Sequence, residues 1–320
     1  MENSTVNPEL YSPAFITVIF MDCLGLFLAV TLNGCHLIIL TYSFPLFSQN
    51  LRLCLRVLAV FDILGGLVCY GMEILVYFNR DIVIASLVGC NIAAATCTTF
   101  VGVSQFILFV ITIDRYVAVA RPLQYYNILT RTRIRTFLVV ALVVGASAGV
   151  VRSIHGALID YCDFIIDGPE LFTQPIMAIY HVAPLSLVIV TTLLNARLLC
   201  IARAQAKRDK MARQSSVNLQ SRDYSTDAHD NEQNSFSERC KSAITISAMV
   251  GASYLVWMPY LILTIICLCE HSNLSFVWKA AMYWSMYSTF WFNPIVFGLV
   301  SSNYKNAVVR LVIKVRLVKS

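Results

Sequence analysis

Seven long apolar stretches, separated by shorter polar segments, dominate the chain. They cover approximately residues 14–41, 53–78, 87–113, 137–158, 176–200, 242–268 and 276–300. Each reaches the roughly 20 residues that an α-helix needs to cross the hydrocarbon core of a bilayer. The pattern therefore predicts an all-α membrane protein, built as a seven-transmembrane helix bundle.

The polar segments divide the rest of the chain. Residues 1–13 form a predicted N-terminal tail, and residues 14–302 form the membrane domain. Within that domain, residues 203–240 are rich in Ser, Asp and Asn and predict a flexible third inner loop with helix extensions at both ends. Apolar and basic residues alternate through 303–320, which predicts a short amphipathic helix on the inner membrane surface. No Lys or Arg precedes the first apolar stretch, so we expect no cleaved signal peptide with a basic n-region.

Composition and charge fix the orientation of these stretches. Of the 320 residues, 58% are hydrophobic and 13% charged, against about 25% charged in soluble domains. With the N-terminus outside, 21 of the 24 basic residues lie in or beside inner segments, as the positive-inside rule requires. We therefore expect a multi-pass plasma-membrane protein with an extracellular N-terminus. The net charge of +6 is therefore mostly a signal of this topology and not of nucleic-acid binding, and the lipid bilayer is an expected partner.

Two sequons and two cysteines lie on the predicted outer side. Asn3 and Asn273 each begin an Asn-x-Ser/Thr sequon, so both are predicted glycosylation acceptors. Cys90 and Cys162 both fall in the oxidising compartment, and Cys162 is the only cysteine between the fourth and fifth stretches. A disulfide between them is expected, with Cys269 as a competing partner. The eleven cysteines show no metal-ligand spacing.

The third stretch ends abruptly in Asp114, Arg115 and Tyr116. Charges at the edge of an apolar helix are usually paired or functional, because a charge inside hydrocarbon costs roughly 2.5–3.5 kcal/mol. Cys90 lies 24 residues before Asp114. A continuous helix would place the two about 36 Å apart, on opposite surfaces of one bilayer.

Polar and proline residues also mark the other stretches. Asn33 and Asp62 lie within the first and second, where an amide or a carboxylate must find a partner. The sixth contains Trp257-Met-Pro259, and Pro259 interrupts the helical hydrogen bonds there. The seventh ends in Asn293-Pro294-Ile-Val-Phe297.

In their order and depth, these motifs make the chain resemble the rhodopsin-like (class A) G-protein-coupled receptors, from about Pro13 to Leu317. The resemblance implies a receptor, not an enzyme. It would bind an extracellular ligand and switch a heterotrimeric G protein at its inner face. The residues implied in coupling and switching are Asp114, Arg115, Tyr116, Pro259, Asn293, Pro294 and Phe297.

The resemblance also implies a small-molecule pocket in the outer half of the bundle. Asp22 and Glu73 lie near its outer side, and Glu73 is a candidate to recognise a positive or donor-rich ligand group. Structural hydrogen bonding, or pairing with Lys279, is the alternative. Cys97 stands where amine receptors of this family carry an aspartate, which disfavours an amine held in that way. The implied ligand-binding residues are mostly aromatic and apolar: Cys97, Val101, Met177, Trp257, Tyr260, Thr264, Tyr283, Tyr287 and Glu73.

One ion site is implied as well. Asp62, Ser104 and Asn293 match residues that hold a sodium ion in this family, and no other cofactor is expected. The position after Thr289 usually carries another small polar residue, but here it is Phe290, so sodium binding stays open.

Three switch positions depart from the family pattern. Ser253 replaces a Phe, Thr192 a Tyr, and Phe297 the Tyr of the last motif. Arg239 stands where an acid often pairs with the arginine of the third stretch, although Glu238 is adjacent. We therefore expect a weak inactive lock and measurable basal signalling. We also expect arrestin and a receptor kinase to act on seven acceptors of the third inner loop: Ser215, Ser216, Ser221, Ser225, Thr226, Ser235 and Ser237.

Several alternatives remain. The segments PLQYYNILT and NPIVFGLVSSNYKNA are similar to olfactory-receptor segments, which favours an odorant-like receptor, whereas the short single-cysteine loop before the fifth stretch does not. A transporter or channel also places acids at mid-membrane, but the sequence lacks the internal repeats typical of such folds. A receptor-like scaffold that binds a ligand without coupling is the third alternative.

Overall fold

The computed structural model describes residues 12–42, 47–78, 87–158, 175–217, 226–270 and 276–319. Within these ranges the chain is helical apart from short turns, and no strand occurs. Six of the helices are long and apolar enough to cross a membrane. This confirms the predicted helical bundle.

The first half of the chain forms four long helices. They are α1 (Pro13–Tyr42), α2 (Gln49–Phe78), α4 (Leu87–Ala120) and α6 (Arg131–Leu158). Two short helices, η2 (Pro122–Gln124) and α5 (Tyr125–Ile128), connect α4 to α6. Pro122 at the start of η2 suits a first helical turn, because its missing N–H has no partner there anyway.

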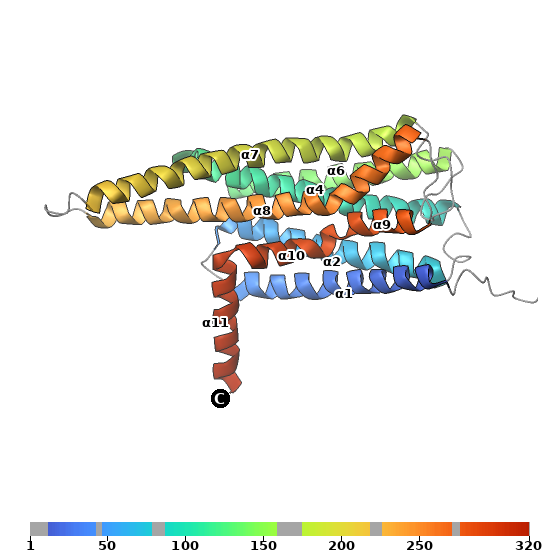
Figure 1. Cartoon of the computed structure of the whole chain (residues 1–320), viewed down its shortest axis with the longest axis horizontal. Coiled ribbons are helices and arrows are strands. Elements are labelled where there is room, and N and C mark those ends of the chain that lie inside the picture. The colour runs from blue at the N-terminus through green and yellow to red at the C-terminus, as the bar shows by residue number, and fades with distance from the viewer. Residues whose placement is uncertain are drawn as a thin grey trace, which may run out of the picture.

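The second half contains two very long helices and three shorter ones. Helix α7 runs over Pro175–Val217 and α8 over Thr226–Glu270. They occupy all of the predicted loop 203–240 except residues 218–225, which lie outside the described residues. Both helices extend past the rest of the bundle at one end, as Figure 1 shows.

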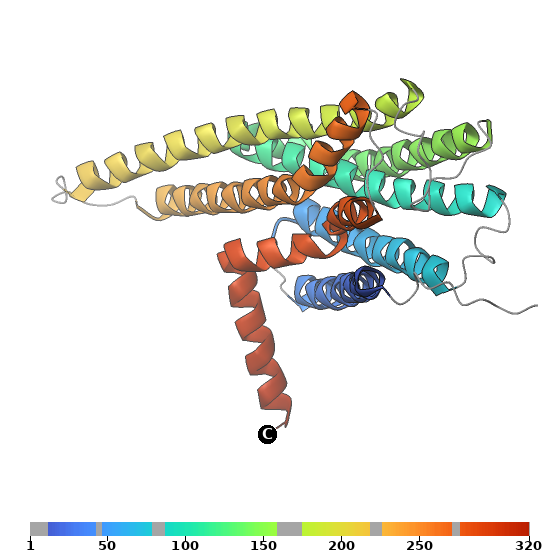
Figure 2. The same cartoon turned by 45° about the vertical axis from the view of Figure 1, so that its right-hand side comes forward.

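The seventh apolar stretch is two helices rather than one. Helix α9 (Phe276–Tyr287) and α10 (Thr289–Val300) meet at Ser288, whose hydroxyl donates to the Ser285 carbonyl at 2.6 Å. The last carbonyls of a helix lack helical partners, and this bond satisfies one of them at the end of α9. Helix α11 (Ser302–Lys319) then leaves the bundle sideways (Figures 1 and 2), and it spans most of the segment for which an amphipathic helix is predicted.

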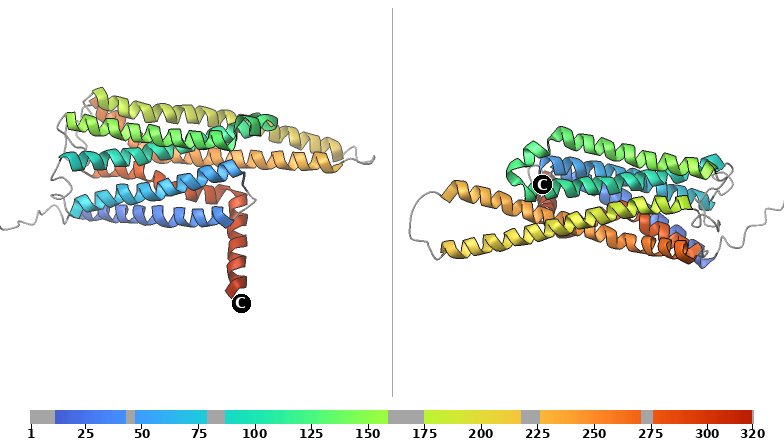
Figure 3. Two further views of the ribbon diagram at one scale, coloured as in Figure 1. Left: turned by 180° about the vertical axis from the view of Figure 1, so that it is seen from behind. Right: turned by 90° about the horizontal axis from the view of Figure 1, so that it is seen from above.

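Helix α4 is the centre of the bundle. It contacts α2, α6, α7, α8 and α10, and its close pairing with α6 is visible from behind in Figure 3. We call the end of the bundle that carries Arg115 the inner end, and the end that carries Cys90 the outer end. One buried apolar cluster fills the inner half, around Ile107, Ile111 and Met249, and a second, largely aromatic one contains Trp257, Tyr287 and Phe290.

Candidate functional site

The acid and the arginine at the inner end of α4 are buried against each other. Asp114 is fully buried and Arg115 is 4% exposed. Arg115 Nε donates to Asp114 Oδ2 at 2.9 Å, and Nη2 bonds the same oxygen. A charged pair in a desolvated place persists only when further hydrogen bonds satisfy its remaining atoms.

Those further bonds come from the segments before α2 and after α4. Ser48 Oγ accepts from Arg115 Nη2 at 2.9 Å, and the Tyr125 hydroxyl donates to Asp114 Oδ1 at 2.7 Å. Asn50 Nδ2 in turn donates to the Tyr125 hydroxyl at 3.2 Å and to the Leu129 carbonyl at 3.0 Å. Burial, reinforced by the charge of Asp114, raises the pKa of Tyr125 above its ordinary value, so its phenol keeps the proton that it donates.

Tyr116, the third residue of the motif, lies apart from this network. It packs beside a small cluster of Val119, Leu198 and Ala202, between α4 and α7. The side chains of Glu238 and Arg239, the candidates for a contact from α8, lie outside the described residues. The prediction of a weak lock between α4 and α8 therefore stays a prediction.

A second polar network lies in the middle of the bundle around Asp62, which is fully buried. Ser104 Oγ donates to Asp62 Oδ1 at 2.7 Å, and Asn293 Nδ2 donates to Asp62 Oδ2 at 3.1 Å. Ser253 Oγ donates to Asn293 Oδ1 at 3.0 Å. This network joins α2, α4, α8 and α10 through one carboxylate.

The residues around this network show how far a sodium ion fits. Carboxylate and hydroxyl oxygens suit a hard cation, and Asp62 and Ser104 supply them side by side. Asn293 turns its amide nitrogen toward Asp62, so it acts on the site through the carboxylate. Phe290 is fully buried and its ring packs against Gly65. Asp62 and Ser104 thus fit a small cation, and sodium binding stays a prediction.

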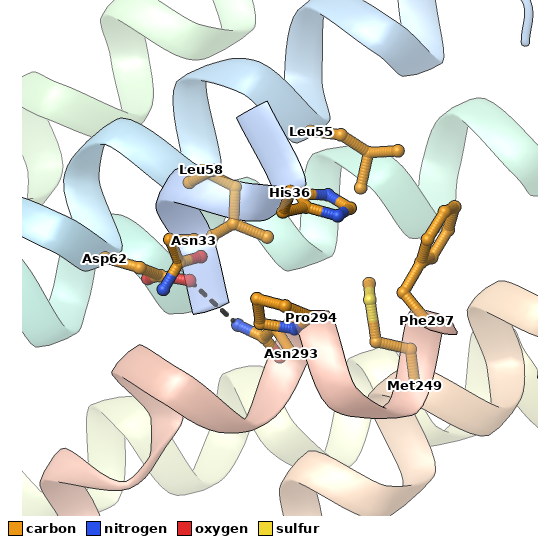
Figure 4. Close-up of a pocket in the computed structure, with 10 residues that line it drawn as sticks. Asn33, His36, Leu55, Leu58, Asp62, Met249, Asn293, Pro294 and Phe297 are labelled. Carbon is orange, nitrogen blue, oxygen red and sulfur yellow. Dashed lines mark hydrogen bonds between the residues drawn. The ribbon is translucent and has the colours of Figure 1, made fainter. Parts of the chain in front are cut away.

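A small cavity opens beside Asp62, lined by residues of α1, α2, α8 and α10. Figure 4 shows His36 and Asn33 of α1 facing it, with the Asn293–Asp62 hydrogen bond at one side. Asn33 Nδ2 donates to the Phe290 carbonyl at 2.6 Å, across from α1 to α10. The amide expected to need partners on a neighbouring helix therefore has one.

The last motif closes the inner half of the bundle through an aromatic contact. Pro294 lies inside α10, and Phe297 is 2% exposed. The Phe297 ring lies 5.5 Å from that of His36 and 5.5 Å from that of Tyr304, which is near the start of α11. Phe297 acts here as an apolar anchor between α1, α10 and α11.

The predicted pocket residues gather in the aromatic cluster of the outer half. Cys97, Val101, Trp257, Tyr260 and Tyr287 belong to this cluster, and Tyr283 packs against it. Thr264 Oγ1 approaches Met282 Sδ at 3.9 Å beside them. Glu73 is half-buried on α2 and lies in hydrogen-bonding contact with Asp22 of α1. The side chain of Met177 lies outside the described residues.

Some of the predicted site residues lie outside the described part of the chain. Cys90 is disulfide-bonded, but Cys162 lies outside the described residues, so the pairing of the two stays a prediction. Asn3 and Asn273 also lie outside them. Pro259 lies inside α8, directly between Trp257 and the outer end of that helix.

Three participating residues were absent from the sequence-based candidates. Ser48 and Tyr125 lie outside the apolar stretches, and Ser253 was noted only as a missing phenylalanine. Each contacts a residue that is distant along the chain: Ser48 is 67 residues from Arg115, Tyr125 is 11 from Asp114, and Ser253 is 40 from Asn293. The available signal was weak: a polar residue next to an element end, and a small polar residue inside an apolar helix.

Comparisons with known proteins agree with this geometry. The model of the 7 transmembrane receptor (rhodopsin family) matches residues 35–297. Octopamine receptor beta-2R from Chilo suppressalis is 22% identical over 78% of this chain and 68% of its own length. Olfactory receptor 5I1 from Homo sapiens is 26% identical over 50% of this chain and 52% of its own length. 5-hydroxytryptamine receptor 5B from Mus musculus is 30% identical, but the match spans only 24% of this chain and 20% of that receptor.

These relatives are receptors and not enzymes. Their names cover different kinds of receptor, so the comparison assigns the family and not a ligand. The family model covers most of the helical bundle, including the Asp62 network and the Asp114–Arg115 pair. The chain therefore belongs to the rhodopsin family of seven-transmembrane G-protein-coupled receptors, as a multi-pass membrane protein.

Proposed function

We propose that this receptor binds a small-molecule ligand within the outer aromatic cluster and activates a heterotrimeric G protein at its inner end. The observation that carries the proposal is a series of contacts that runs from the outer aromatic cluster to the Asp62 network in the middle of the bundle. In the outer half, the Tyr287 ring stacks on Phe290 at 6.2 Å. Phe290 is followed along α10 by Asn293, which bonds both Asp62 and Ser253.

A ligand that moves Trp257 or Tyr287 would act on this series first. Trp257 is 2% exposed, and its ring lies 5.6 Å from Tyr260. Because packed cores are bistable rather than continuously deformable, a small shift here favours a second arrangement of α8 against α10. The Ser253–Asn293 hydrogen bond is the contact that such a rearrangement must change. At the inner end, release of Arg115 from Asp114 and Ser48 would free its guanidinium for a G protein.

The orientation follows from the same proposal. The N-terminus faces the extracellular space and the basic inner segments face the cytoplasm, in the plasma membrane. A receptor kinase and arrestin would act at the same inner end. An odorant-like ligand is the second candidate, favoured by the similarity to Olfactory receptor 5I1 over half of the chain.

The test is a G-protein activation assay in transfected cells, with reporters for each G-protein class and a small-molecule library as ligands. Arg115→Ala should abolish ligand-driven activation at matched surface expression. Arg135→Ala is the matched control, because Arg135 is an exposed arginine at the start of α6. Activation that survives Arg115→Ala, or that falls equally in both variants, would refute the role given to Arg115. A receptor that activates no G protein with any ligand would favour a scaffold.

A further inference from the structure

Two carboxyl groups meet between α1 and α2 in the outer half of the bundle. Asp22 is 1% exposed, and Glu73 lies in hydrogen-bonding contact with it. A hydrogen bond between two carboxyl groups requires that one of them carry a proton. The two carboxyl groups therefore share one proton and carry one negative charge between them.

Asp22 has an oxygen that this contact does not use. No atom of the described residues donates a hydrogen bond to Asp22 Oδ2, although the oxygen is buried. An unpaired charge inside the membrane domain is costly, and such residues usually face a partner or an interior path. The orphaned oxygen thus requires a donor that the described part of the chain does not supply.

Aromatic rings surround the pair. Tyr70 packs its ring against Gly25, one helical turn from Asp22, and lies 5.8 Å from the ring of Tyr287. Trp284 Nε1 donates to the Met21 carbonyl at 3.1 Å, which brings the indole beside the residue before Asp22. Glu73 and Trp284 beside the pair are each half-buried. Rings and carboxylates together form the usual surroundings of a bound organic cation.

We propose that Asp22 Oδ2 is the anchoring point for the positively charged group of a small-molecule ligand, such as a protonated amine with an aromatic body. The proposal rests on the proposed function, because it names the ligand class of the same receptor. The ammonium donates to Asp22 Oδ2, and Glu73 keeps its proton and its hydrogen bond to the neighbouring oxygen. Asp22 is the binding residue, and Glu73 is a positioning residue.

This assignment places the anchor on α1 instead of α4. On α4, Cys97 is a buried thiol that offers no charge to an amine. Tyr287 connects the two positions, since it belongs to the same cluster as Cys97 and its ring lies 5.8 Å from that of Tyr70, which packs against α1 at Gly25. A ligand held at Asp22 would therefore direct its aromatic body toward Tyr287 and the cluster that contains Trp257.

The experiment measures binding to the full-length receptor, purified in lipid nanodiscs, without a G protein. The probes are benzylamine, 2-phenylethylamine and tryptamine, each compared with the neutral alcohol of the same skeleton. A ligand that binds the folded state raises the unfolding temperature with its concentration, which yields an apparent Kd. We expect at least one amine to stabilise the wild-type receptor more than its alcohol does. Equal effects of amine and alcohol for all three pairs would overturn the proposal.

The variants separate the roles of the two acids. Asp22→Asn should weaken amine binding at least about tenfold and leave alcohol binding unchanged, because it removes the paired charge. Glu73→Gln should retain most amine binding, since the amide still donates to Asp22. The opposite ranking, with Glu73→Gln losing the amine and Asp22→Asn keeping it, would overturn the assignment. If Asp22→Asn does not fold, Asp22→Ser serves as the second variant. The comparison of amine and alcohol in the wild-type receptor needs neither variant and tests the proposal in either case.

The G-protein assay is kept separate from these measurements. Amine-selective binding without activation of any G protein would refute the proposed coupling and leave the cation site supported. Activation by ligands that are all indifferent to Asp22→Asn would support the coupling and overturn the cation site.

Discussion

Arg115 donates a hydrogen bond from Nη2 to Ser48 Oγ across 2.9 Å, which joins the inner end of α4 to the residue that precedes α2. The same Ser48 oxygen also accepts from the Leu51 amide at 3.4 Å, as an N-cap does. One serine therefore both begins α2 and restrains the arginine assigned to G-protein contact. This restraint comes from the first inner loop.

Ser48→Ala should raise basal G-protein signalling above the measurable level expected of the wild type, because it removes one restraint on Arg115. A hydrogen bond to a charged group contributes about 1.5–3 kcal/mol, enough to shift a two-state equilibrium roughly tenfold or more. Ser48→Thr keeps the hydroxyl and serves as the control. Basal signalling is read by reporters at equal surface expression. A Thr variant as active as the Ala variant would contradict the role of the hydroxyl.

Tyr125→Phe should lower the stability of the receptor by about 1–3 kcal/mol, because Asp114 Oδ1 is buried and loses its donor. The matched control is Tyr126→Phe, since Tyr126 is 72% exposed and is the adjacent residue. Thermal unfolding of the purified receptor measures both. Equal midpoints for the two variants would mean that the phenol of Tyr125 contributes nothing to the inner network.

If Asp62 and Ser104 bind sodium, sodium should stabilise the wild-type receptor more than a larger monovalent cation does. The measurement compares unfolding temperatures in sodium chloride and in choline chloride at equal ionic strength. Asp62→Asn and Ser104→Ala should each abolish the difference, because they remove the carboxylate charge and the hydroxyl ligand. Equal unfolding temperatures of the wild type in the two salts would show that it does not bind sodium at this site. In that case the Asp62 network would hold α2, α4 and α10 by hydrogen bonds alone.

Alanine at all seven acceptors of the third inner loop should reduce arrestin recruitment and internalisation after activation, because phosphates there supply the added negative charge. The control replaces Thr132 and Thr136, which are exposed on α6 at the same end of the bundle. Five of the seven acceptors lie in α7 and α8, so these helix ends must open for a kinase to reach them. Unchanged recruitment in the seven-fold variant would point to desensitisation without phosphate.

The sequence predicted the bundle well, because a helix that crosses a membrane must satisfy its backbone within about 20 apolar residues. It also placed Asp62, Ser104 and Asn293 near one depth, and the structure brings all three together. The break at Ser288 was not predicted, because a single serine in an apolar run gives no helix-end signal.

The partners of Arg115 were not predicted either. Tyr125 and Ser48 reach the inner end of α4 through the geometry of two turns, which local residue patterns do not specify. Ser253 illustrates the opposite case. A serine is smaller than the phenylalanine that is usual in the family at this position, so the sequence alone indicates a loss of packing volume. In the structure its hydroxyl donates the hydrogen bond to Asn293 that links α8 to α10.

The length of α8 gives it the mechanics of a lever. Pro259 lies near its outer third, and the arm from there to Thr226 measures about 50 Å at 1.5 Å per residue. A rotation of about 5° at the proline therefore displaces the far tip by about 4 Å, while side chains next to Pro259 move by only tenths of an ångström. If a ligand binds in the aromatic cluster as proposed, a very small displacement at Pro259 is therefore enough to move the far end of α8 by several ångströms.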